Sequence, residues 1–207
     1  MKKKSSELHF LTSLEEGKQL TQQTISKKIS VSIGFVNALI KKFINKGIIK
    51  VQQAPYKRFI YYLTPDGFAE KSKLVLEYLT DSLSLFRLIR TELNEIFLNN
   101  RNFSFILYGI SEISEIAILS ANEIGIEISS VIDPKFKAKK YFNIPVLKKL
   151  PKSLNKSKIL ICSTKNAQEI YFDLLQIYKE ENLITIDSLF VSKKKPNFKP
   201  KKNYEKN

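Results

Sequence analysis

Residues 21–49 read TQQTISKKISVSIGFVNALIKKFINKGII, and they predict two short helices joined by a tight turn. Thr21 and Ser32 each precede a helical pattern, and their hydroxyl oxygens are good acceptors for the N–H groups of a first helical turn. Gly47 follows the second pattern and predicts its C-terminal end. The second helix has one apolar stripe at the spacing i, i+3, i+4, i+7, i+8, made of Val36, Leu39, Ile40, Phe43 and Ile44.

The sequence on either side extends these helices to a winged helix. Upstream, apolar residues recur at helical spacing over 7–14, and Gly17 predicts the end of that first helix. Downstream, the runs 48–53 and 59–63 are typical of two strands joined by a basic tip. The order helix, helix, turn, helix, hairpin is a layout whose third helix enters the major groove of DNA.

The face of the third helix opposite its apolar stripe has the chemistry of a DNA reader. Small residues there let the backbone approach the bases, and Asn37 can make a bidentate contact to adenine. Lys41 and Lys42 suit phosphates or guanine edges. For Phe35 two interpretations stay open, packing on the first helix or touching a thymine methyl group. The predicted DNA contacts are Thr21, Gln22, Thr24, Ser32, Gly34, Phe35, Asn37, Ala38, Lys41, Lys42, Asn45 and, at the wing tip, Lys57 and Arg58.

Residues 5–85 resemble the winged-helix regulators of the MarR type. The resemblance rests on the 21–49 string and on the exit of the hairpin, where Tyr61-Tyr62-Leu63-Thr64-Pro65-Asp66-Gly67 matches the segment YxLTPxG. It implies a transcription regulator that binds double-stranded DNA, and a homodimer is predicted separately from the helix that follows. The alternative is a winged helix used as a protein-interaction adaptor, without DNA binding.

A further helix begins at Pro65, with Thr64 as its N-cap, and runs to about Leu98 unless two shorter helices replace it. Its apolar stripe is wider than a small winged helix can cover, which predicts a dimerisation surface. The polar run 99–102 predicts a domain boundary. The expected organisation is a winged helix over 1–64, a helical connector over 65–100, an α/β domain over 101–190 and a disordered basic tail over 191–207.

Strands alternate with helices in the second half of the chain, which predicts a parallel sheet with helical crossovers and an α/β fold overall. The strands are expected at 103–108, 126–132, 144–146, 158–162 and 183–186, and the helices at 111–123 and 167–181.

Residues 103–190 resemble a Rossmann-like unit, the nucleotide-sugar-binding N-terminal domain of bacterial sugar acyltransferases. The first strand runs into Gly109-x-Ser111-x-x-Ser114, which keeps one glycine of the fingerprint G-x-G-x-x-G, and Asp133 follows the next strand. The N–H groups of residues 111–113 are expected to be free for a phosphate, although Glu112 repels one. The predicted ligand residues are Gly109, Ser111, Glu112, Ile113, Asp133, Ser163 and Thr164.

The effector expected there is a nucleotide or nucleotide-sugar, with no cofactor required. By resemblance, the regulated genes would serve polysaccharide or nucleotide-sugar metabolism. A degenerate scaffold that binds nothing and serves dimerisation is the alternative. A nucleotide-sugar-modifying enzyme fragment is the rival from another class. An acyltransferase is expected to need a hexapeptide-repeat β-helix after this unit, and no such repeat is seen here.

Composition narrows the function classes. The 35 Lys and Arg outnumber the 20 Asp and Glu, which gives a net charge of +15 and favours a polyanionic partner. The lone cysteine, Cys162, lies in an apolar run and is expected to be buried. With one cysteine and one histidine, His9, neither a metal site nor histidine-based catalysis is expected. No membrane span or secretion signal is seen, and a reduced, cytoplasmic compartment is expected.

Overall fold

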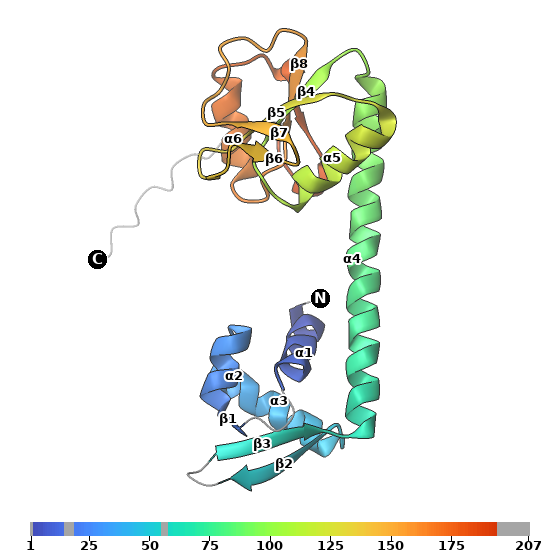
Figure 1. Ribbon diagram of the computed structural model, residues 1–207, viewed down its shortest axis with the longest axis vertical. Coiled ribbons are helices and arrows are strands. Elements are labelled where there is room, and N and C mark those ends of the chain that lie inside the picture. The colour runs from blue at the N-terminus through green and yellow to red at the C-terminus, as the bar shows by residue number, and fades with distance from the viewer. Residues whose placement is uncertain (1, 15–18, 55–57, 194–207) are drawn as a thin grey trace, which may run out of the picture. The chain divides into compact units, whose positions relative to one another are not determined.

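The computed structural model describes residues 2–14, 19–54 and 58–193. The chain forms two compact units, Met1–Ser84 and Leu85–Asn207, here called the N-terminal unit and the C-terminal unit (Figure 1). One long helix, α4 (Pro65–Asn99), contributes residues to both. Three predictions fall outside the described residues. They are the end of the first helix at Gly17, the wing tip at residues 55–57 and the basic tail beyond residue 193.

The N-terminal unit is a winged helix, as predicted. Its helices are α1 (Lys2–Ser13), α2 (Gln22–Ile29) and α3 (Ile33–Asn45), followed by the hairpin strands β2 (Ile49–Ala54) and β3 (Arg58–Leu63). The two-residue strand β1 (Gln19–Leu20) pairs antiparallel with β3, so that the sheet order is β1-β3-β2. This third strand was not predicted, because two residues are too short to show a periodic pattern.

Helices α2 and α3 are both capped by local hydrogen bonds. The hydroxyl of Thr21 accepts the N–H of Thr24 at 3.1 Å, and that of Ser32 accepts the N–H of Phe35 at 3.2 Å. Past the end of α3, Gly47 has a left-handed φ of 70°. Its N–H donates to the carbonyl of Ile44, and the next N–H donates to that of Phe43, both at 2.9 Å. These two bonds form a Schellman motif, and they satisfy the last carbonyls of the helix.

The core of the N-terminal unit is apolar and draws on every one of its helices. Val36, Leu39, Ile40 and Phe43 of α3 are buried as predicted. The rings of Phe10 and Phe43 stack with centroids 5.6 Å apart, joining α1 to α3. Ile44 was wrongly assigned to this core. It is 43% exposed, because it lies at the edge of the buried stripe.

The chain that follows the wing is hydrogen-bonded to the residues just after α3. The hydroxyl of Thr64 donates to the carbonyl of Gly47 at 2.6 Å and accepts the N–H of Gly67 at 3.0 Å, which confirms Thr64 as the N-cap of α4. A Cβ on Gly67 would lie 2.1 Å from the carbonyl oxygen of Ile48. A side chain at position 67 therefore does not fit, which explains physically why the LTPxG segment ends in glycine.

Helix α4 is a single helix of 35 residues, which settles the choice between one helix and two. Its C-terminal part packs into the C-terminal unit through Ile89, Leu93 and Phe97. Between residues 75 and 88 the helix instead exposes large apolar side chains: Val75, Leu76, Tyr78, Leu79, Leu83, Leu85 and Leu88.

The C-terminal unit is a Rossmann-like α/β domain with a six-stranded sheet of order β6-β7-β5-β4-β8-β9. All neighbours are parallel except β6 and β7. This confirms the predicted fold class. In chain order its elements are β4 (Ser104–Tyr108), α5 (Glu112–Ile124), β5 (Ile128–Ile132), β6 (Lys140–Tyr141), β7 (Ile144–Leu147), β8 (Ser157–Ile161), α6 (Ala167–Leu175) and β9 (Leu183–Thr185), with short 3₁₀ turns at Glu180–Asn182 and Asp187–Leu189.

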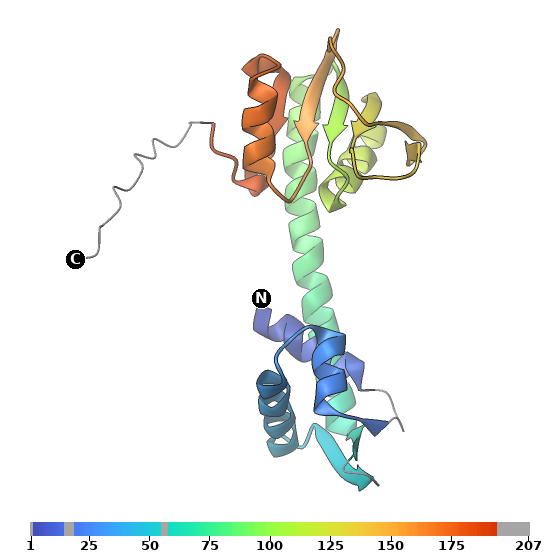
Figure 2. The ribbon, with the colours of Figure 1, turned by 90° about the vertical axis from the view of Figure 1, so that its left-hand side faces the viewer.

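Both faces of this sheet are covered by helices (Figure 2). Residues Phe105 and Leu107 of β4 face the core shared with α4 and α5, whereas Ile106 faces the core shared with α6. A parallel sheet that is buried on both sides produces continuous apolar strands, as the sequence has here. Cys162 is fully buried as expected, and burial raises the pKa of its thiol.

Two predicted boundaries in the C-terminal unit were wrong. Helix α6 ends at Leu175 rather than at 181, because the chain turns there and Tyr178 packs back onto the core, donating its hydroxyl to the carbonyl of Pro151. Strand β5 begins at Ile128 rather than at 126, because the N–H of Ile126 still bonds to Ala121 of α5 at 2.8 Å. No helix in the described part of the chain is long and apolar enough to cross a membrane.

Candidate functional site

The face of α3 that points away from the core is small and polar. Gly34, Ala38, Lys41 and Asn45 are all exposed and follow one another at spacings of three and four residues. They therefore form one stripe along the helix. Asn37 lies at the edge of this stripe and is half-buried. A Cβ on Gly34 would meet no atom within 4 Å, so the start of the stripe is open. We call Gly34, Asn37, Ala38, Lys41 and Asn45 the α3 stripe.

Two residues predicted to contact DNA have partners inside the N-terminal unit. Phe35 is half-buried and packs against the apolar core, which favours the first of its two interpretations. The Nζ of Lys42 lies 2.6 Å from a carboxylate oxygen of Glu7, whose side chain is 9% exposed. The same ammonium lies 5.3 Å from the ring centroid of Phe43. The charge of Lys42 is thus held by a contact between α3 and α1.

The start of α2 is described in full, whereas the wing tip is described only in part. Thr21 and Thr24 are exposed, and their hydroxyl oxygens lie 2.8 Å apart, while Gln22 is half-buried. Ser32 is exposed and caps α3. Lys57 lies outside the described residues. Arg58 is described only through its backbone, at the start of β3, where it is the register partner of Ala54.

The C-terminal unit has a cleft of about 620 Å³ at the carboxyl ends of β4, β5 and β8. Strand β4 is the point at which the sheet order reverses, and ligands of open α/β sheets bind beside such a point. The structure brings six of the seven predicted ligand residues to this cleft: Gly109, Ser111, Glu112, Asp133, Ser163 and Thr164. The seventh, Ile113, lies in the apolar core instead.

The start of α5 is closed, contrary to the expectation that its N–H groups are free. The hydroxyl of Ser111 accepts the N–H of Ile113 at 3.1 Å, and the hydroxyl of Ser114 accepts the N–H of Ser111 at 3.0 Å. This capping box satisfies two of the three N–H groups expected to meet a phosphate. The Ser111 hydroxyl also donates to the carbonyl of Cys162 at 2.5 Å, which ties α5 to the end of β8.

Gly109 and Asp133 have structural roles in this unit. Gly109 has a φ of 94°, and a Cβ there would lie 2.8 Å from that of Ser163. The chain after β8 therefore passes too close for a larger residue. One carboxylate oxygen of Asp133 accepts the N–H of Ile110 at 3.2 Å. The other accepts those of Lys135 and Phe136 at 2.8 and 3.1 Å.

The lining of the cleft contains more acidic residues than were predicted from the sequence. Glu169 and Asp173 of α6 join Glu112 and Asp133, against the two cations Lys135 and Lys165. Burial, with the negative charges of Asp173 and Asp133, raises the pKa of Tyr108, which also lines the cleft. The four-residue spacing of Glu169 and Asp173 in the helix after β8 was visible in the sequence, but no motif drew attention to it. Among the described residues, no group of three or more His, Cys, Asp or Glu is arranged to hold a metal ion.

No protein-family model and no curated protein matches this sequence. Among solved structures, the chain is similar to MepR, a transcription regulator of the multidrug efflux pump MepA of Staphylococcus aureus. The identity is 18%, over 58% of this chain and 74% of that one, with a TM-score of 0.37. BpsR of Bordetella bronchiseptica, whose DNA binding is regulated by 6-hydroxynicotinic acid, is 16% identical over 60% of this chain and 77% of its own, with a TM-score of 0.38.

A third solved structure covers more of the chain. Human N-acetylserotonin methyltransferase in complex with SAM is 12% identical over 87% of this chain and 73% of its own, with a TM-score of 0.31. All three scores are too low to carry an argument about function. The likeness to sugar acyltransferases stays a prediction, and so do the roles of the individual site residues.

Proposed function

We propose that this protein is a transcription regulator whose N-terminal unit binds double-stranded DNA through the α3 stripe. One observation carries the proposal: a capped helix in a winged-helix unit presents small residues, an asparagine and a lysine to solvent. A helix fits the major groove, small residues allow close approach, and asparagine and lysine recognise base edges and phosphates. The resemblance of residues 5–85 to MarR-type regulators supports the same role.

The proposed regulator is a homodimer. Helix α4 exposes a cluster of apolar side chains between residues 75 and 88, and Leu76 is 63% exposed. Apolar surfaces of this kind mark interfaces, and a two-fold dimer matches a palindromic DNA site. Light scattering of the full chain at micromolar concentration tests this point. A dimer is expected, whereas a monomer both with and without DNA contradicts it.

The cleft of the C-terminal unit is a second candidate site, because six residues predicted to bind a ligand line it. The closed start of α5 and the acidic lining disfavour a phosphate. We propose that the part of a nucleotide-type effector held here is its sugar or base, with Ser163 and Thr164 as hydrogen-bonding groups. Binding would shift the populations of states that differ in DNA affinity. Control of polysaccharide or nucleotide-sugar genes rests on the resemblance of residues 103–190 alone.

A thermal-stability panel of nucleosides, nucleotides and nucleotide-sugars on the full chain tests the effector. A ligand at 100 times its dissociation constant should stabilise the chain by about 2.7 kcal/mol. Nucleosides should stabilise the chain at least as much as the corresponding nucleotides do. The variant Thr164→Val, at an exposed cleft position, should abolish the gain without lowering the stability of the free protein. Absence of a shift across the panel contradicts this part of the proposal.

The DNA-binding role is tested by selecting bound duplexes from a random-sequence library with the full chain. We expect enrichment of one palindromic sequence. Lys41→Ala should weaken the binding of that sequence, whereas Lys179→Ala, in an exposed pair with Glu181, serves as the control and should not. Binding without sequence preference, or no binding at all, contradicts the proposal. The second outcome favours the adaptor interpretation of the winged helix.

A further inference from the structure

Within the described part of the C-terminal unit, residues 85–193, the positive charge is concentrated in one stretch of chain. Residues 134–158, here called the basic segment, contain nine lysines and neither Asp nor Glu. The remaining described residues of the unit, 85–133 and 159–193, contain twelve Asp and Glu and only six Lys and Arg. A high overall lysine content would scatter lysines among acids. It does not explain their separation within one unit.

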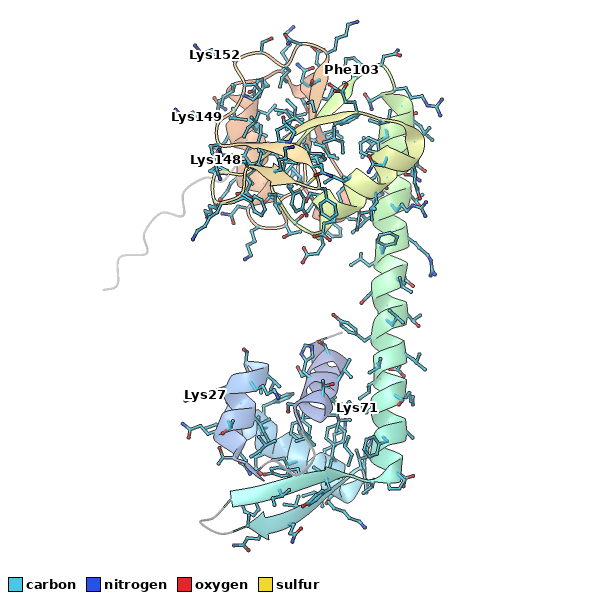
Figure 3. The ribbon with its side chains drawn as sticks, viewed as in Figure 1. Lys27, Lys71, Phe103, Lys148, Lys149 and Lys152 are labelled. Carbon is cyan, nitrogen blue, oxygen red and sulfur yellow. The ribbon has the colours of Figure 1, made fainter. Side chains whose placement is uncertain are left out.

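The lysines of the basic segment point to solvent. Eight of the nine are exposed, and Lys158 is the half-buried one, with its Nζ 4.6 Å from the ring centroid of Phe103. In Figure 3 the side chains of Lys148, Lys149 and Lys152 project outward from the same side of the unit. None of the nine forms an ion pair with a carboxylate elsewhere in the described parts of the chain. The nearby carboxylate of Asp133 is occupied by backbone N–H groups.

An aromatic side chain lies exposed within the same segment. Phe142 is 56% exposed at the turn between β6 and β7, and both it and Asn143 have left-handed φ values, of 49° and 64°. A bulky residue is rarely found in this conformation. Its ring makes an edge contact with Tyr141, with centroids 4.9 Å apart. The hydroxyl of Tyr141 itself donates to a carboxylate oxygen of Glu115 at 3.1 Å. Glu115 belongs to α5 and lies outside the basic segment.

We propose that the basic segment is a second nucleic-acid contact, which binds the phosphate backbone of duplex DNA independently of sequence. Lysine is a mobile point charge that binds phosphates, and contacts to phosphates carry no sequence information. All nine cations of the segment are lysines. The winged helix would then select the sequence, and the basic segment would add affinity and salt dependence. This inference rests on the proposed DNA-binding role but concerns a different surface.

The test compares two triple variants of the full chain. Lys149→Gln/Lys152→Gln/Lys156→Gln removes three exposed charges between β7 and β8. Lys148 is left intact, because its Nζ donates to the carbonyl of Asp133 at 3.2 Å. The matched control, Lys73→Gln/Lys179→Gln/Lys193→Gln, removes three exposed charges outside the segment. Affinity is measured against salt concentration on two duplexes, the selected site and a scrambled version.

We expect the slope of log affinity against log salt to fall by about 0.9 for each lost phosphate contact, up to about 3 for the first variant. The ratio of affinities for the two duplexes should not change. The control variant should keep the wild-type slope. An unchanged slope in the first variant overturns the inference, and so does an equal fall in the control.

Two further outcomes separate this inference from its neighbours. If the wild-type chain binds both duplexes equally and the first variant alone loses slope, the winged-helix role fails and the basic segment stands. Vesicles of phosphatidylserine and phosphatidylcholine provide the other arm. If the first variant loses vesicle binding while its DNA slope is unchanged, the segment serves an anionic membrane and the inference is overturned.

Discussion

Helices α3 and α5 begin and end alike but differ in what they leave open. Each has 13 residues, a serine N-cap and a left-handed glycine just beyond its last turn. Helix α3 buries four residues along one stripe and leaves the opposite stripe to solvent. Helix α5 buries seven residues, and its start is tied to Ser114 and to the end of β8. The same local signals therefore occur in one helix with an open face and in one that is largely enclosed by the core.

The comparison implies that α3 can be disturbed from its core side or from its open side with opposite effects. From the core side, Gly67→Ala forces a Cβ against the carbonyl of Ile48, directly after α3. Overpacking against backbone cannot be relieved by a rotamer change, so we expect a loss of about 3 kcal/mol in the stability of the N-terminal unit. Denaturant unfolding with segment-resolved hydrogen exchange measures this.

The matched substitution on the open side is Gly34→Ala. Because the added methyl group meets no atom, it should stabilise the helix by about 0.5–1 kcal/mol through backbone entropy. Affinity for DNA should fall nevertheless, because the methyl group crowds the approach to the bases. A Gly34→Ala protein that is both more stable and equally tight on DNA would show that the α3 stripe does not face the groove.

Adjacent lysines of α3 sharpen the same contrast. Lys42→Met removes the partner of the nearly buried Glu7 carboxylate. The ammonium is a third exposed, so we expect a loss of about 2 kcal/mol, less than for a fully buried pair. Lys41→Met should change stability by less than about 0.5 kcal/mol, as is usual for surface sites, and should weaken DNA binding. Equal stability losses in the two variants would contradict this division of roles.

The two serine caps give a smaller expected loss of stability than Gly67→Ala or Lys42→Met. Ser32→Ala and Ser111→Ala should each cost about 1 kcal/mol, the usual contribution of an N-cap. The loss should be confined to the N-terminal unit for the first and to the C-terminal unit for the second, as measured by segment-resolved hydrogen exchange. If anions were to stabilise the C-terminal unit only after Ser111→Ala, the capping box would be the group that excludes phosphate from the wild-type cleft.

The parts of the fold that follow from near neighbours in the chain were predictable. The caps at Thr21, Ser32 and Thr64, the stripe of α3 and the strand–helix alternation of the second half all depend on residues a few positions apart. The positions of Gly109, Asp133 and Ser163 in one cleft followed from the rule that parallel strands bring their carboxyl ends to one edge.

Contacts between distant residues were not predictable. Glu7 and Lys42 are 35 positions apart, and nothing in the local pattern pairs them. The closed start of α5 had a local signal, Ser111 and Ser114 three residues apart. The glycine fingerprint competed with the capping box for the same serines, and only coordinates decide between them. The basic segment was hidden because charges averaged over the whole domain nearly cancel.

The measurement that tests the central claim most directly is the base preference of Asn37→Ala. Duplexes are selected from the random library with the wild-type chain and with this variant, and the enriched sequences are compared position by position. If α3 reads the major groove, the variant should lose preference at one base pair per half-site, by about 1–3 kcal/mol, and keep the others. An unchanged preference at every position would contradict the proposal that the α3 stripe reads DNA.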